Sequence, residues 1–438
     1  RTGSGYRISD YLLDRDELPT TTTDSLWEAA CELATPEEAF AIGFWAYEAG
    51  RTREAETWWR KAAEQGNTTA MFNLGVLLEE QGRVGEAEGW YAKAAGQGNT
   101  GAMITLGVLL KEQGRVGEAE GWYAKAAGQG NTGAMIILGV LLKEQGRADE
   151  AEGWYAKAAE QGHTDAMVNL GVLLHEQGRV GEAEGWWRKA AEQGHTDAMA
   201  GLGVLLHEQG RVGEAEGWCA KAAEQGHTDA MNNLGRLLHE QGRVGEAEGW
   251  YTKAAEQGHT TAMVNLGVLL HEQGRTEEAE TWWRKAAEQG NTDAMAGLGV
   301  LLHARGRTEE AETWWRKAAE QGNTTAMVNL GVLLHARERA LEEMRGTAAR
   351  LGHVVEANAL DRLLKQRGRA ADAEGWWRRA AELGHVDAMY RLGCLWLARG
   401  DSAEARGWLQ KAADEGHEEA ARLLTRLEQP EADQPDEE

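Results

Sequence analysis

Residues 163–194 read HTDAMVNLGVLLHEQGRVGEAEGWWRKAAEQG, and close copies of this stretch recur every 32 residues along the chain. Each copy carries a tryptophan and a Leu-Gly pair at fixed positions: Trp58, Trp90, Trp122, Trp154, Trp186, Trp218, Trp250, Trp282 and Trp314, and Leu74-Gly75 through to Leu330-Gly331. A fixed period of this length is typical of solenoids, in which each repeat buries its apolar face against its neighbours. The architecture therefore follows from one repeat and its stacking.

The spacing of apolar residues within this repeat predicts two helices. The first covers 165–177 and has one apolar stripe, made of Met167, Leu170, Leu173 and Leu174. Gly178 stands where a glycine ends a helix, and the second helix covers 182–193. Ala183, Trp186, Trp187 and Ala190 share one face of the second helix, so we predict that the tryptophan column is buried between helices. Gly171 lies inside the first helix, which indicates close packing there.

The pattern Ala-x-x-Trp-aromatic-x-Lys-Ala-Ala-Glu-x-Gly-His-x-x-Ala-Met-x-x-Leu-Gly resembles Sel1-like repeats, which are relatives of tetratricopeptide repeats. The resemblance covers residues 35–428 and implies an all-α, right-handed superhelical solenoid of antiparallel helix pairs. One departure is the short linker between Gly178 and Glu182, which matches tetratricopeptide repeats and lacks the longer Sel1 loop.

The repeat register divides the chain into four regions. Residues 1–34 form a helical lead-in, and Thr35-Pro36-Glu37-Glu38 then opens the first repeat as a capping box. Repeats one to ten cover 35–352, the tenth being degenerate, and we predict a break in the superhelix near 336–347, where the first helix runs on or the second packs poorly. Repeats eleven and twelve with a terminal helix cover 353–428 as a semi-independent block, and 429–438 is a disordered acidic tail.

Composition limits the partners of the chain. The net charge is −25, which argues against nucleic acid and anionic membrane, because both require a basic surface. No apolar run is long enough to span a membrane. Three widely spaced cysteines, Cys31, Cys219 and Cys394, predict free thiols in a reducing compartment, here the bacterial cytoplasm.

The sequence contains no catalytic motif and no phosphate-binding loop. Histidines at one repeat position, from His175 to His335, suggest metal ligands at first sight. Adjacent repeats lie about 10 Å apart, however, and each repeat offers one such ring, so two rings cannot share one ion. We therefore expect no cofactor, no metal site and no enzymatic activity.

The part of the first helix that is not used for packing is the candidate site. Asp165, Val168, Val172 and His175 form a second stripe, whose centre is a valine column, and in tetratricopeptide superhelices this stripe lines the concave groove. An apolar column edged by acidic residues and histidines suggests a groove for a peptide or helix. The alternative is that each valine packs on the next repeat. The predicted groove residues are Val168, Val172, His175, Val204, His207, Asn232, Arg236, His239, Val268, His271, Val300 and His303.

One repeat, 227–258, departs from the others at linked positions. Arg236 interrupts the valine column, Asn232 replaces an apolar residue one turn earlier, and His239 lies three residues further on. The preceding helix carries Cys219 where its neighbours carry an aromatic residue. Arginine beside an amide suits a carboxylate or phosphate on a partner. The alternative is drift, with Arg236 reaching water or pairing with a nearby glutamate.

The sequence thus predicts a non-catalytic scaffold that binds a protein or peptide partner. Residues 6–13 and 25–33 resemble the segment that joins a signalling NTPase of the STAND type to helical repeats in some bacterial proteins. A sensor arm of such an NTPase therefore stays an alternative, although the chain holds no Walker motif. A second alternative is a self-associating structural solenoid, that is, a homo-oligomer.

Overall fold

The computed structural model describes residues 34–351 and 373–428, and every regular element within them is an α-helix. The chain divides into two compact units, Arg1–Leu205 and Leu206–Glu438. Three predicted features lie outside the described residues: nearly all of the N-terminal lead-in, the first helix of the eleventh repeat, and the acidic tail.

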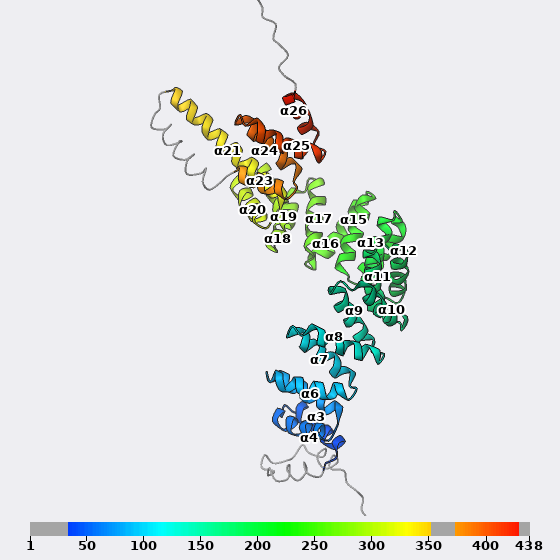
Figure 1. Cartoon of the computed structure of the whole chain (residues 1–438). Coiled ribbons are helices and arrows are strands. Elements are labelled where there is room, and N and C mark those ends of the chain that lie inside the picture. Colours follow the sequence, from blue (N-terminus) through cyan, green and yellow to red (C-terminus); the bar gives the residue numbers. More distant parts are fainter. Residues whose placement is uncertain (1–33, 352–372, 429–438) are drawn as a thin grey trace, which may run out of the picture. The chain divides into compact units, whose positions relative to one another are not determined.

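The first unit is built from consecutive helices of similar length, and from α3 to α12 each helix packs on the next (Figure 1). The first helix of each repeat is called the A helix below, and the second is the B helix. The elements are α3 (Pro36–Glu48), α4 (Thr52–Glu64), α5 (Thr68–Glu80), α6 (Val84–Gly96), α7 (Thr100–Glu112), α8 (Val116–Gly128), α9 (Thr132–Glu144), α10 (Ala148–Glu160), α11 (Thr164–Glu176) and α12 (Val180–Glu192), with α13 (Thr196–Glu208) containing the boundary between the units.

The second unit continues the same alternation and differs from it at one long helix, α21. Its elements are α14 (Val212–Glu224), α15 (Thr228–Glu240), α16 (Val244–Glu256), α17 (Thr260–Glu272), α18 (Thr276–Glu288), α19 (Thr292–Ala304), α20 (Thr308–Glu320), α21 (Thr324–Arg350), α23 (Ala373–Glu382), α24 (Val386–Ala398), α25 (Ser402–Asp414) and α26 (Glu418–Glu428). The prediction of an all-α repeat solenoid made of helix pairs is confirmed.

Local signals place the helix ends. Thr35 and Glu38 form the expected capping box: Thr35 Oγ1 accepts from the Glu38 N–H at 3.2 Å, and Glu38 Oε2 accepts from the Thr35 N–H at 3.0 Å. Later A helices have an N-cap residue such as Asn131, which precedes α9 and whose Oδ1 accepts from the Ala134 N–H at 2.9 Å. Between A and B helices the chain turns at a glycine such as Gly178, whose φ of 76° suits a residue without Cβ.

The two helices of a repeat meet where a glycine of the A helix faces an aromatic ring of the B helix. A methyl group on Gly171 would overlap the indole of Trp187, so only glycine allows this approach. The Trp187 Nε1–H donates to the carbonyl oxygen of Val168 at 3.2 Å. We call the close contact between the glycine and the aromatic ring the joint. It recurs with Trp59, Tyr91, Tyr123, Tyr155, Tyr251, Trp283, Trp315 and Trp377 against Gly43, Gly75, Gly107, Gly139, Gly235, Gly267, Gly299 and Gly331.

The prediction that the whole tryptophan column is buried is wrong for most of its members. Trp58 and Trp90 are buried, but those from Trp122 to Trp314 are only half-buried. From Trp90 to Trp314, the ammonium group of the lysine three residues later covers the indole, 3.8–4.6 Å from the ring centroid. The fully buried aromatic ring belongs to the following residue, because that position faces the glycine of the joint.

The tenth repeat pairs its helices in an unexpected way. The first helix continues through 336–347 and forms the single helix α21 of 27 residues. A continuing first helix was one of the two outcomes expected from the sequence. The B helix that packs on α21 is α23, in which Trp377 meets Gly331 and donates from Nε1 to the carbonyl oxygen of Val328 at 3.4 Å. The boundary predicted at 352/353 therefore falls between the two helices of one joint.

Candidate functional site

In the first unit, the valine column lies at the surface. Val108 and Val140 are 43% and 38% exposed, and Val76, Val172 and Val204 are half-buried. Val172 thus does not pack fully against the next repeat, which was the alternative considered from the sequence. We call this column the valine stripe. In the second unit it comprises Val268, Val300 and Val332, which are 39%, 51% and 37% exposed.

A hollow of about 360 Å³ opens on the valine stripe of the first unit. Its residues come from α9, α10 and α11 and are Val140, Lys143, Glu144, Tyr155, Asn169 and Val172. Tyr155 is the buried aromatic ring of a joint and forms the floor. Burial, helped by the charges of Glu144 and Glu176, raises the pKa of Tyr155 to about 12, so its hydroxyl stays protonated. The hollow therefore offers apolar walls, one amide, one hydroxyl and the charged side chains of Lys143 and Glu144.

Ion pairs cross from one A helix to the next along one edge of the stripe. In the first unit, Lys111 Nζ lies 2.8 Å from Glu144 Oε2, and Lys143 Nζ lies 2.8 Å from Glu176 Oε1. In the second unit, histidines take the lysine position: His207 Nε2 lies 2.8 Å from Glu240 Oε2, and His239 Nε2 lies 3.2 Å from Glu272 Oε2. The residues of this edge thus hold neighbouring A helices together.

The remaining histidines of this position lie against the aromatic rings of the joints. His175 lies against Trp187, with ring centroids 5.7 Å apart. His271, His303 and His335 lie in the same way against Trp283, Trp315 and Trp377, with centroids 5.5–5.7 Å apart. Among the described residues, no group of three or more metal-ligating side chains comes together.

In the repeat that holds Arg236, the singled-out polar side chains all have partners within the chain. Arg236 Nη1 donates to Glu240 Oε1 at 2.7 Å and lies 3.5 Å from His207 Nδ1. Asn265 of the next A helix donates from Nδ2 to Asn232 Oδ1 at 2.9 Å. Burial raises the pKa of the Cys219 thiol to about 11. An anionic partner would have to displace Glu240 from Arg236, and anion binding by this repeat stays a prediction.

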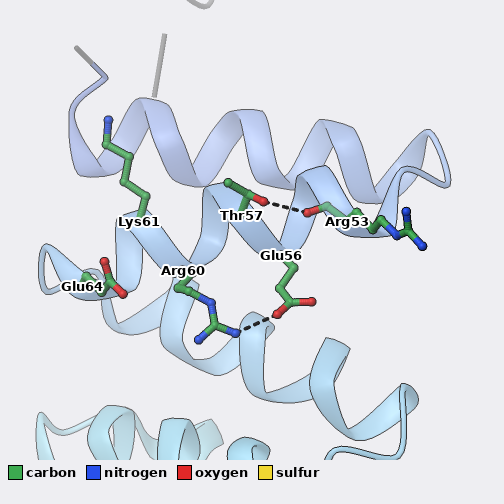
Figure 2. A pocket seen from close by; sticks show the side chains of 6 residues that line it. All are labelled: Arg53, Glu56, Thr57, Arg60, Lys61 and Glu64. Carbon is green, nitrogen blue, oxygen red and sulfur yellow. Dashed lines mark hydrogen bonds and ion pairs between the residues drawn. The ribbon is translucent and has the colours of Figure 1, made fainter. Parts of the chain in front are cut away.

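A second hollow, of about 490 Å³, is lined by residues of α4 (Figure 2). Its six residues are charged or polar, namely Arg53, Glu56, Thr57, Arg60, Lys61 and Glu64. Arg60 Nη2 donates to Glu56 Oε1 at 2.7 Å, and the Thr57 hydroxyl donates to the Arg53 carbonyl oxygen at 3.0 Å. Arg60 and Glu56 are paired with each other, whereas Lys61 Nζ is buried without a hydrogen-bond partner. Because all of its lining residues are charged or polar, this hollow is a weaker candidate for an apolar ligand than the one on the valine stripe.

The predicted site residues differ in how far their side chains are exposed on this surface. Val168, Val172, His175 and Val204 in the first unit are half-buried, as are His207, Asn232, Arg236 and His239 in the second, whereas Val268, His271, Val300 and His303 are exposed. Four further groups of this surface were not predicted from the sequence, namely Lys111, Lys143, the glutamates that pair with them, and Tyr155. The 32-residue register could have found them, because Lys111 and Lys143 share the repeat position of His175.

Sequence comparison identifies the repeats. Three family models, each described as tetratricopeptide repeat, match 46–102, 138–198 and 187–230, then 228–256, and then 260–285 and 292–317. The Sel1 repeat model matches 116–131, 371–385 and 386–417. Among curated proteins, none matches the chain significantly. Repeats of both families generally serve as protein-interaction scaffolds.

Two solved structures illustrate the likeness. A protective antigen of uropathogenic Escherichia coli strains, which displays an SLR fold, is 26% identical over 94% of this chain and 92% of its own, with a TM-score of 0.50. A Sel1 repeat protein from Oxalobacter formigenes is 30% identical over 50% of this chain and 99% of its own, with a TM-score of 0.42. The chain belongs to the Sel1-like, tetratricopeptide-type helical repeat proteins. No helix in the described part of the chain is long and apolar enough to cross a membrane.

Proposed function

We propose that this chain is a non-catalytic scaffold that binds a protein or peptide partner along the valine stripe. The observation that carries the proposal is that a valine at the same repeat position is exposed in several repeats. The valines therefore form a column at the surface and not in the core. A contiguous row of apolar side chains at the surface is typical of a binding site.

The polar groups around the stripe support binding better than catalysis. The carboxylate of Glu240 has a lowered pKa: burial raises it, but His207 and Arg236 outweigh the burial. This shift is explained by the ion pairs that join neighbouring A helices, so a structural role accounts for it. We therefore assign Val140, Val172 and their counterparts to contact with the partner, and the ion-paired edge to holding the A helices in register.

Selection from a displayed library of random peptides against the whole chain tests the proposal. Peptides that bind the stripe should lose binding to a chain carrying Val140→Gln and Val172→Gln, because glutamine keeps the helix but removes the apolar surface. Val84→Gln is the matched control, since Val84 is 37% exposed at the start of α6 and lies outside the stripe. If selected peptides bind the double variant as well as the parent, the valine stripe is not the binding surface.

A further inference from the structure

The spacing of the valine stripe sets the conformation of what it can bind. Neighbouring A helices touch through their side chains: Lys111 of α7 reaches Glu144 of α9 at 2.8 Å, and within the second unit Asn265 of α17 reaches Asn232 of α15 at 2.9 Å. Because asparagine side chains are short, the contact between α15 and α17 indicates directly packed helices, which lie about 8–10 Å apart. One valine per A helix therefore gives one apolar point about every 10 Å along the stripe.

A chain in an extended or polyproline II conformation advances by about 3.1–3.4 Å per residue. Three residues of such a chain therefore match one repeat of the stripe. In polyproline II the match extends to direction, because every third side chain points the same way. A ligand with an apolar side chain at every second or fourth residue would not match the spacing of the valines after the first contact.

The size of the hollow favours single side chains over a packed helix. The hollow between Val140 and Val172 measures about 360 Å³, near the lower end of the range of about 300–1,000 Å³ for ligand pockets. A helical partner could present an apolar residue at every seventh position, about 10 Å apart. It would then leave most of its surface without apolar contact.

Charge on both sides of the stripe indicates the sign of the partner. At the N-terminal ends of the A helices, Asp165 and Asp229 are 62% and 70% exposed, although His195 Nε2 and His259 Nε2 lie 2.9 Å and 2.7 Å from their carboxylates. At the C-terminal ends, Glu144 and Glu176 are each 53% exposed although they are ion-paired, and the whole chain carries −25. Carboxylates that flank an apolar track favour lysine or arginine between the apolar residues of the ligand.

We propose that the valine stripe binds an extended, basic peptide segment with an apolar side chain at every third residue. This assignment rests on the proposed function and deepens it, because it names the conformation, the period and the charge of the partner segment. Successive apolar side chains enter the hollows between neighbouring A helices. The intervening basic residues face the aspartates and glutamates at the two edges.

Synthetic peptides of one composition separate the period from the composition. Fluorescein-labelled peptides of leucine, lysine and serine carry leucine at every second, third or fourth residue, and a helix-forming peptide carries it at every seventh. Each is titrated into the whole chain. The third-residue peptide should bind about ten-fold or more tightly than the others, and replacing its lysines by glutamates should abolish binding. Val140→Gln with Val172→Gln should weaken it about ten-fold, and Val84→Gln should leave it unchanged.

The outcomes distinguish this inference from the proposed function. If the second-, fourth- or seventh-residue peptide binds as tightly and still depends on Val140 and Val172, the stripe binds peptides but the period is wrong. If none binds while the library selection yields valine-dependent peptides, the inference is likewise overturned and the proposed function stands. If the third-residue peptide binds the double variant undiminished, and thermal unfolding shows that variant to be folded, both fail.

Discussion

The helix pairs α19/α20 and α21/α23 form the same kind of joint, but the residues that meet are much further apart in the sequence in the second pair. In α19/α20, Trp315 donates to the carbonyl oxygen of Ala296 at 3.1 Å, 19 residues away. In α21/α23, Trp377 donates to the carbonyl oxygen of Val328 at 3.4 Å, 49 residues away. A histidine ring lies against each indole, with centroids 5.6 Å and 5.5 Å apart. The complementary surfaces of glycine and indole therefore select the partner helix, and a short linker is not required.

The comparison also shows what the longer connection loses. Arg307, at the turn between α19 and α20, joins Glu280 of the preceding B helix to Glu310 of its own, with both distances 2.7 Å. Arg339 holds the same register position, but α21 continues through it, and the residue pairs along its own helix with Glu343 at 3.7 Å. Arg337 still reaches Glu312 of α20, so part of the contact between repeats is kept.

Removing the indole should have the largest effect and should be equal in the two pairs. Trp315→Ala and Trp377→Ala should each cost about 3–5 kcal/mol, because a buried aromatic side chain leaves a cavity. Hydrogen exchange should rise locally, in α19/α20 and in α21/α23 respectively, because repeat arrays lose structure around the damaged interface first. Trp314→Ala is the control. That ring is half-buried, and its loss should cost about 1–2 kcal/mol. A much smaller effect for Trp377→Ala would mean that α23 is not held by the joint.

Adding one methyl group to α21 tests the close approach. Gly331→Ala should destabilise by about 1–3 kcal/mol, because the new carbon overlaps the indole of Trp377. Gly346→Ala lies further along the same helix, where no heavy atom approaches the new carbon within 4 Å, and should stabilise by about 0.5–1 kcal/mol. Thermal unfolding of both variants gives the answer. Stabilisation by both substitutions would contradict a tight contact at Gly331.

Acid should weaken the contacts between repeats that Glu280 makes with Arg307 and Glu312 makes with Arg337. Burial raises the pKa values of Glu280 and Glu312, but Arg284 and Arg307 at the first, and Arg337 and Arg316 at the second, outweigh burial and leave both below 4.5. A carboxylate with a lowered folded-state pKa stabilises fully above its unfolded pKa and loses that contribution as the pH falls through the folded value. We therefore expect thermal stability to fall below about pH 4.5.

Variants assign this acid response to its groups. Glu280→Gln should flatten the decline at least as much as Glu312→Gln, because Glu280 also contacts Arg305 and so has one more arginine partner. The melting temperature measured from neutral pH to about pH 3 is the readout. An unchanged slope in both variants would place the acid sensitivity elsewhere.

The smallest difference concerns the turn arginines. Arg307→Ala should lower the melting temperature slightly, since it removes two short ion pairs, one to Glu280 of the preceding repeat and one to Glu310 of its own repeat. Arg339→Ala should leave it unchanged, because its single pair is long and both side chains are largely exposed. A larger loss for Arg339→Ala than for Arg307→Ala would reverse the comparison drawn from the geometry.

The sequence predicts the helices well because their signals are local. The predicted spans 165–177 and 182–193 agree with α11 and α12 to within two residues at each end, and Gly178 turns the chain as expected. The sequence does not tell which of Trp186 and Trp187 is buried, because both lie on the same broad face of the helix. Only the position of Gly171 on the other helix settles it.

The pairing of α23 with α21 could not be read from the register either. Counting from residue 353 restores the 32-residue period, which predicts a partner within the eleventh repeat, while the observed partner carries Gly331. The valine stripe was predicted as a column, and its exposure is as expected for a surface. Its ion-paired edge was missed because a pair between residues 33 positions apart leaves no local pattern in either helix.

The joint between Gly331 and Trp377 gives α21 and α23 a noncovalent link in addition to their covalent connection. A chain cleaved in this connection would yield two fragments, each carrying one half of the joint, which should reassemble in solution by fragment complementation. The loss of the covalent link would appear only as a dependence on concentration.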